Sequence, residues 1–221
     1  MALLPCVEIE PSDEARASVI WMHGLGADGH DFEPVVPWLG LPADFGARFV
    51  FPHAPAIPVT LNAGMVMPAW YDIIEIDLAR RHDREGILRS RESVRELISR
   101  EVDRGVPTSS IVLAGFSQGG AVALDVGLRY EESLAGIMAL STYLVLEDEI
   151  EGERSAANSS TPVLQVHGTH DPMVPVTRGQ AARDQLIGSG YEVQWQEYPM
   201  QHEVCPDELV LIGQWLQKVL A

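Results

Sequence analysis

The chain is poor in basic residues, and this shortage narrows the range of its partners. Only 15 of its 221 residues are Lys or Arg, a single one of them a lysine (Lys218), against 32 Asp and Glu. The formal net charge is therefore −17. A surface this negative repels phosphate backbones and anionic headgroups, which argues against nucleic-acid binding and slows the encounter with acidic substrates.

Cysteines and long apolar runs are also scarce. Cys6 and Cys205 are the only cysteines, too few for a disulfide framework in a chain of this size. No apolar run reaches the length of a membrane span, and the N-terminus lacks a basic region followed by a long apolar stretch. We therefore expect a cytoplasmic protein without stable membrane insertion.

The composition is otherwise that of an ordinary globular protein. A length of 221 residues with 46% hydrophobic residues suits one domain, residues 1–221, with a sizeable core. We expect it to be a monomer or a weak homodimer.

Short apolar runs alternate with segments of helical periodicity along the chain. The expected strands are 17–22, 48–51, 111–114, 134–140, 163–167 and 192–198, and the expected helices are 86–104, 118–130, 176–187 and 207–220. This alternation predicts an α/β fold with a mostly parallel sheet covered on both faces.

Two stretches of the chain show neither strand nor helix periodicity. The first, 52–83, carries methionines and aromatics that suggest the wall of a site, and the second, 144–160, is polar and expected at the surface.

A serine stands between glycines at the corner between an expected strand and helix, in Gly115-Phe116-Ser117-Gln118-Gly119-Gly120. This pattern is typical of a nucleophile elbow, in which a strained turn holds the serine hydroxyl beside a helix N-terminus. The alternative is a glycine-rich turn in which Ser117 only caps the helix. Whether Ser117 is a nucleophile therefore depends on whether the chain also supplies an acid, a base and an oxyanion hole.

An acid and a base follow the serine, each after an expected strand. Asp171 comes next in the chain and His202 comes last, which is the order of an α/β-hydrolase triad. Ser117 would supply the attacking oxygen, His202 would move its proton, and Asp171 would hold the imidazole. Taken singly, Asp171 is also a common turn residue before proline, and His202 could be a surface residue. Cys205 is a rival nucleophile, but a small apolar residue near a helix start is the reading we favour.

A glycine-rich loop, 23–29, supplies the remaining part of the expected site. A developing oxyanion needs two donors, and we assign them to the backbone amides of Leu25 and Gln118. His23 opens the loop, and we expect it to hold the loop in place.

No cofactor and no metal site are expected. Among the seven histidines no pair has the spacing of a zinc-binding helix, and His167 with His170 and Asp171 is the most metal-like group.

Six apolar residues are expected to form an acyl pocket, with core packing as the alternative for each: Met65, Val66, Met67, Trp70, Met173 and Val174.

Several segments match a family pattern jointly. They are His23-Gly24-Leu25-Gly26, Pro68-Ala69-Trp70-Tyr71-Asp72, the elbow, Leu140-Ser141-Thr142-Tyr143, His167-Gly168 with Asp171, and Tyr198-Pro199-Met200-Gln201-His202-Glu203. With them the chain resembles the phospholipase/carboxylesterase family, which includes the acyl-protein thioesterases. The bacterial carboxylesterases look most similar, because of the Trp-Tyr-Asp and Tyr-Pro-Met segments. One departure is Gln201, where relatives often carry a glycine.

The resemblance implies a compact α/β-hydrolase without a large lid domain, with Ser117, Asp171 and His202 as its triad. It also implies activity on short to medium acyl esters. We therefore expect a serine carboxylesterase that hydrolyses short- to medium-chain carboxylic esters or thioesters through an acyl-enzyme. The alternatives are an acyl-protein thioesterase or lysophospholipase acting on lipidated substrates, and a catalytically silent α/β-hydrolase that serves as a binding module.

Overall fold

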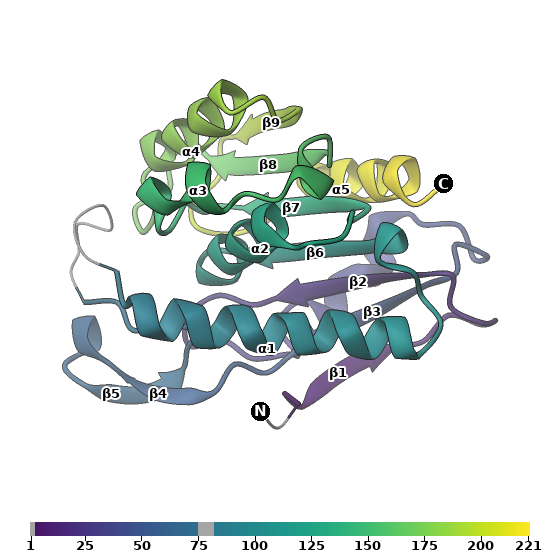
Figure 1. Ribbon diagram of the computed structural model, residues 1–221, viewed down its shortest axis with the longest axis horizontal. Coiled ribbons are helices and arrows are strands. Elements are labelled where there is room, and N and C mark those ends of the chain that lie inside the picture. Colours follow the sequence, from purple (N-terminus) through teal and green to yellow (C-terminus); the bar gives the residue numbers. More distant parts are fainter. Residues whose placement is uncertain (1–2, 75–81) are drawn as a thin grey trace.

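A seven-stranded sheet forms the centre of the computed structural model, which describes residues 3–74 and 82–221. Its strands run in the order β1-β3-β2-β6-β7-β8-β9 (Figure 1). They are β1 Cys6–Ile9, β2 Ala17–Met22, β3 Ala47–Pro52, β6 Ile111–Phe116, β7 Gly136–Leu140, β8 Val163–Gly168 and β9 Val193–Tyr198. Only the pair β1–β3 is antiparallel. The predicted mostly parallel sheet is therefore confirmed.

Helices cover both faces of this sheet. The α-helices are α1 Arg84–Asp103, α2 Gln118–Arg129, α3 Glu147–Glu153, α4 Val176–Gly188 and α5 Pro206–Val219, and the short 3-10 helices are η1 Glu33–Leu39, η2 Thr60–Asn62, η3 Thr108–Ser110 and η4 Ala156–Asn158. Alternate strand residues belong to two separate cores. Ile20 and Met22 pack with α1 and α2 on one face, and Val19 and Trp21 pack with η1 and α5 on the other.

The central strands are buried along their whole length, as expected for a sheet with two covered faces. Helix α1 begins where the Asp83 side chain accepts a hydrogen bond from the Gly86 N–H. Helix α5 begins with Pro206, whose missing N–H costs nothing at a helix start. Among the described residues, no helix combines the length and apolar character needed to cross a membrane.

Three described strands (β1, β4 and β5), helix α3 and the short 3-10 helices were absent from the expectation. Strand β1 pairs antiparallel with β3, and β4 Ala56–Val59 and β5 Met65–Pro68 form a separate hairpin (Figure 1). The stretch 144–160, expected at the surface, contains α3 and buries Leu144 and Ile150. The expectation was wrong for residues 144–146 and for Ile150, which face the core, whereas most of 151–160 is exposed or half-buried. The end of the other irregular stretch, 75–81, lies outside the described residues.

Parallel strands end at the same edge of the sheet, so the loops after β2, β6, β8 and β9 gather there. These four loops carry the candidate residues of the site.

Candidate active site

Ser117 adopts the strained backbone expected of an elbow. Its φ and ψ are 54° and −120°, a conformation that costs an L-residue about 1–3 kcal/mol. The turn is closed by glycines. A Cβ on Gly115 would lie 2.2 Å from the backbone of Gly119, and a Cβ on Gly119 would lie 2.4 Å from the Met22 carbonyl oxygen. Helix α2 can therefore lie this close to strands β6 and β2 only without side chains at Gly115 and Gly119.

The structure brings Ser117, His202 and Asp171 into one hydrogen-bonded chain. The Ser117 Oγ lies 2.9 Å from His202 Nε2, and His202 Nδ1 lies 2.6 Å from Asp171 Oδ2. A carboxylate can only accept, so the imidazole carries its proton on Nδ1 and leaves Nε2 free to accept the serine hydroxyl. Phe116 packs against the His202 ring, with 4.7 Å between ring centroids, and so limits its orientation.

The Asp171 side chain is buried, and hydrogen bonds hold its carboxylate ionised. Its Oδ1 accepts hydrogen bonds from the Met173 and Val174 N–H groups, both at 2.8 Å. Burial acts to raise the pKa of Asp171, but the hydrogen bonds from His202 and from the loop amides outweigh it and lower this pKa. His167 holds the same loop, since its Nε2 lies 2.9 Å from the Val174 carbonyl oxygen.

Two backbone N–H groups lie in the loops beside the serine. Gln118 is the first residue of α2, so its N–H has no partner within the helix. The Leu25 N–H, in the loop after β2, has no acceptor among the described residues. The neighbouring N–H of Gly26 donates instead to the Pro68 carbonyl at 2.9 Å, which ties the loop to the end of β5. Neither of the two amides expected to bind the oxyanion therefore has a hydrogen-bond partner within the described part of the chain.

His23 lies below this loop, fully buried, as its expected supporting role requires. Its Nδ1 lies 2.7 Å from the Gly24 carbonyl oxygen, and its Nε2 accepts the Ala54 N–H at 3.1 Å. Burial lowers the pKa of His23, so the ring is neutral at physiological pH.

The apolar residues expected to form an acyl pocket separate into two groups. Met65, Val66 and Met173 are exposed by 64%, 64% and 68%, and Met67 lies beside the glycine loop, where a Cβ on Gly26 would be 3.8 Å from its sulfur. Trp70 and Val174 are only 2% and 4% exposed.

The expectation for Trp70 and Val174 is therefore corrected, because core side chains cannot contact a substrate without rearrangement. The Trp70 indole N–H donates to the His23 carbonyl at 2.9 Å, and the Val174 backbone binds Asp171. Sequence reasoning also missed the Gln118 side chain, which binds the backbone on both sides of the Trp70–Tyr71 peptide. The sequence did contain a signal for this contact, because the elbow with Gln118 and the segment with Trp70 and Tyr71 both belong to the family pattern.

The described residues contain no group of three His, Cys, Asp or Glu side chains placed to hold a metal ion.

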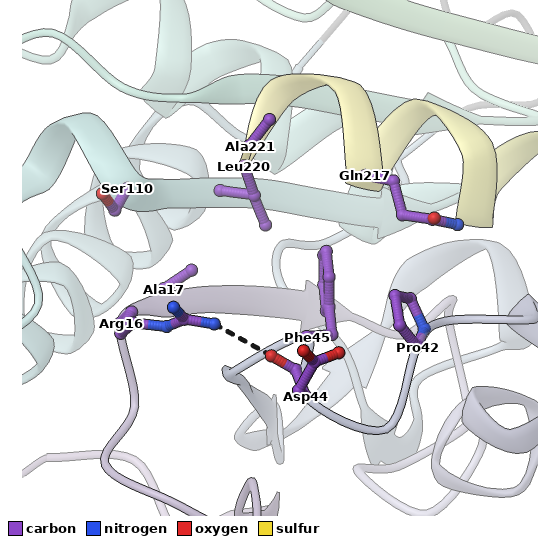
Figure 2. A pocket seen from close by; sticks show the side chains of 9 residues that line it. All are labelled: Arg16, Ala17, Pro42, Asp44, Phe45, Ser110, Gln217, Leu220 and Ala221. Carbon is purple, nitrogen blue, oxygen red and sulfur yellow. Dashed lines mark hydrogen bonds between the residues drawn. The ribbon is translucent and has the colours of Figure 1, made fainter.

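A cavity of about 470 Å³ lies at the opposite edge of the sheet, near the start of β2 and the end of α5 (Figure 2). Arg16 in its wall donates to the Asp44 carbonyl at 2.9 Å. This cavity includes none of the candidate catalytic residues.

A parallel sheet with a serine elbow and a Ser–His–Asp chain at its carboxyl edge is the arrangement of an α/β-hydrolase. Comparison with known proteins agrees with this class. The model of the family described as phospholipase/carboxylesterase matches residues 5–220. The chain belongs to this family. It is therefore a serine hydrolase that acts on esters or thioesters.

The most similar relatives include a fungal thioesterase and a plant structure. Acyl-protein thioesterase 1 of Gibberella zeae is 41% identical, over 95% of this chain and 93% of the relative. The crystal structure of Arabidopsis thaliana SOBER1 superposes with a TM-score of 0.87 at 32% identity, covering 94% of this chain and 100% of that one. The Bacillus cereus carboxylesterase has a TM-score of 0.79 at 17% identity, over 99% of this chain and 95% of that one, and shows the fold alone.

Proposed function

We propose that this chain is an acyl-protein thioesterase or lysophospholipase, which removes acyl groups from the thioesters of S-acylated proteins or the oxygen esters of lysophospholipids through an acyl-Ser117 intermediate. The observation that carries the proposal is the chain of hydrogen bonds from Ser117 through His202 to Asp171, beside the backbone amides of Leu25 and Gln118, which have no acceptor among the described residues. The fungal relatives are named acyl-protein thioesterase 1, and this name supports the alternative reading over the carboxylesterase expected from the sequence. The cytoplasmic location and the monomer or weak homodimer stay predictions.

The first half of the reaction forms the acyl-enzyme. His202 Nε2 takes the proton of the Ser117 hydroxyl while Oγ attacks the carbonyl carbon. The carbonyl oxygen becomes an oxyanion and accepts hydrogen bonds from the amides of Leu25 and Gln118. The carbon–sulfur or carbon–oxygen bond then breaks, and His202 returns its proton to the leaving thiolate or alkoxide. Asp171 stabilises the imidazolium in between.

The second half releases the acid. Water loses a proton to His202 and attacks the acyl carbon, and the same two amides hold the second oxyanion. Ser117 leaves with the proton that His202 returns, and the free carboxylic acid departs. No step needs a metal or a cofactor.

The apolar acyl chain needs apolar contacts near Ser117. Four residues supply them in this proposal: Met65, Val66, Met67 and Met173. Three of them, Met65, Val66 and Met173, are exposed, so they can contact an acyl chain without rearrangement of the core. Methionine side chains adapt readily to different apolar surfaces, which suits substrates of varied acyl length.

Replacing the nucleophile tests the proposal. Ser117→Ala is expected to remain folded and to lose at least about a thousandfold in turnover, whereas Ser12→Ala, an exposed serine, keeps wild-type turnover. A fluorophosphonate adduct should map to Ser117 by peptide mass. Retained turnover in Ser117→Ala overturns the nucleophile assignment.

A substrate panel tests the thioesterase assignment separately. The wild-type protein is assayed on p-nitrophenyl esters of increasing chain length and on an S-palmitoylated peptide. A higher kcat/KM for the peptide than for every simple ester supports the proposal. Preference for a short ester would instead establish the carboxylesterase alternative, and a labelled but inactive protein would favour the binding module.

A further inference from the structure

Each proposed oxyanion donor belongs to a peptide unit whose carbonyl faces a buried side chain. The Gln118 N–H shares its peptide with the Ser117 carbonyl, and the Leu25 N–H shares its peptide with the Gly24 carbonyl. Because a trans peptide is planar, a hydrogen bond that fixes the carbonyl also fixes the direction of the N–H on the opposite side.

Thr142 makes this bond on the Ser117 side. Its Oγ1–H donates to the Ser117 carbonyl oxygen at 2.6 Å, next to a 3.1 Å bond from the Ala121 N–H. Thr142 follows β7 and is fully buried. A Cβ on Gly120 would lie 2.9 Å from the Thr142 side chain, so the glycine makes room for this contact. Among the residues that the structure describes, its only other contact of this kind is with the Tyr143 carbonyl oxygen, at a longer 3.5 Å.

His23 makes the corresponding bond on the Leu25 side. The Ala54 N–H can only donate, so His23 Nε2 is the acceptor and the ring proton is on Nδ1. Nδ1–H therefore donates to the Gly24 carbonyl at 2.7 Å. The Trp70 indole N–H donates to the His23 carbonyl, one peptide earlier in the chain. Two successive carbonyls at the start of the glycine-rich loop are thus fixed by hydrogen bonds.

We infer that Thr142 and His23 are positioning residues that orient the Gln118 and Leu25 amides toward the oxyanion by binding the carbonyls of the same two peptides. Each bond also withdraws electron density from its carbonyl, which makes the N–H of that peptide a stronger donor. The inference rests on the proposed function, because only a reaction through an oxyanion uses these donors. Both side chains are fully buried, so in this inference they act only through the two amides and not by contact with the substrate.

Thr142→Val tests the inference, because it removes the hydroxyl and keeps the shape. We expect kcat to fall by about 10- to 100-fold, less than the 10²- to 10³-fold typical of losing a whole donor, with KM changed by less than about threefold. Thr142→Ser restores the hydroxyl and most of kcat. Thr161→Val is the matched control, because Thr161 is also buried but its hydroxyl binds Asn158, away from the site. An unchanged kcat in Thr142→Val, or an equal loss in Thr161→Val, overturns the inference.

A transition-state analogue gives a second readout. A trifluoromethyl ketone adds to the serine and places an oxyanion against the two amides. The inhibition constant of Thr142→Val should rise by the same factor as its kcat/KM falls, because both report the same donors. A loss of kcat/KM without weaker inhibition would show a different defect and overturn the inference.

The His23 half is tested with two amide variants. His23→Asn keeps a donor near the position of Nδ1, and His23→Gln keeps a polar group near Nε2 only. The Asn variant should retain the higher kcat, and the reverse order overturns the role of His23. The Ser117→Ala variant separates the two claims. If Ser117→Ala abolishes turnover while Thr142→Val does not change it, the proposed function stands and this inference fails.

Discussion

The carboxamide of Gln118 holds the backbone of Trp70 from 48 positions further along the chain. Its Oε1 accepts the Trp70 N–H at 2.9 Å, and its Nε2 donates to the Tyr71 carbonyl at 2.6 Å. Trp70 in turn holds the His23 carbonyl. A residue proposed to give one oxyanion donor through its backbone therefore connects, through its side chain, to the loop that carries the other.

Gln118→Ala should destabilise the fold without removing the Gln118 amide. The change leaves the Trp70 N–H and the Tyr71 carbonyl buried without partners, at a cost of about 1–3 kcal/mol each. Urea unfolding measures this loss, and Gln194→Ala, an exposed position on β9, should stay within about 0.5 kcal/mol of wild type. A Gln118→Ala protein as stable as wild type would show that water or another group satisfies both atoms.

Asp171→Asn should reduce turnover far more than stability. The amide lacks the charge that stabilises the imidazolium and favours the wrong histidine tautomer, a defect worth up to about 10⁴-fold in kcat. Fluorophosphonate labelling of Ser117 should slow in parallel. Asp184→Asn, at a site whose side chain is 65% exposed, is the matched control. Wild-type labelling in Asp171→Asn would require another acid beside His202.

Much of this site could be predicted from the sequence, and the remainder depends on tertiary contacts. Parallel strands such as β6 are continuous apolar runs that local pattern reveals. Strand β1 has only four half-buried residues, and β4 and β5 contain prolines that argue against strands. The bonds of Thr142 and Gln118 span 25 and 48 residues, so no local pattern indicates them. The triad was predictable because a local apolar run precedes each of its three residues. Their order along the chain, Ser, Asp and His, can be read directly from the sequence.

Glu208 makes stability depend on pH at the start of α5. It is fully buried, its Oε1 has no partner among the described residues, and burial raises the pKa of its carboxyl to about 8. The folded protein therefore keeps this proton to a higher pH than the unfolded chain, whose pKa is near 4.5. Its stabilising contribution is complete below pH 4.5 and falls as pH rises toward 8, by at most about 1.4 kcal/mol per pH unit.

Glu208→Gln should remove that dependence, because the amide does not titrate. We expect the variant to gain stability over wild type between pH 5 and pH 8 in urea unfolding at both values. All other titrating groups are shared by the two proteins, so the difference reports Glu208 alone. A constant difference at the two pH values would mean that Glu208 is ionised throughout.

The exposed methionines Met65 and Met173, which are proposed to contact the acyl chain, should decide how acyl length affects rate. If Met65 and Met173 contact the acyl chain, Met65→Ser and Met173→Ser remove apolar area that only a long chain covers. We expect kcat/KM for a palmitoyl thioester to fall by about 5- to 30-fold, on the basis of about 25 cal/mol per Å² of lost apolar contact, while acetyl and butyryl esters change by less than about twofold. Val210→Ser removes an exposed apolar residue on α5 and should leave the length profile unchanged. An equal fall for short and long substrates would place these methionines outside the acyl path, because uniform loss reports damage to the reacting centre instead.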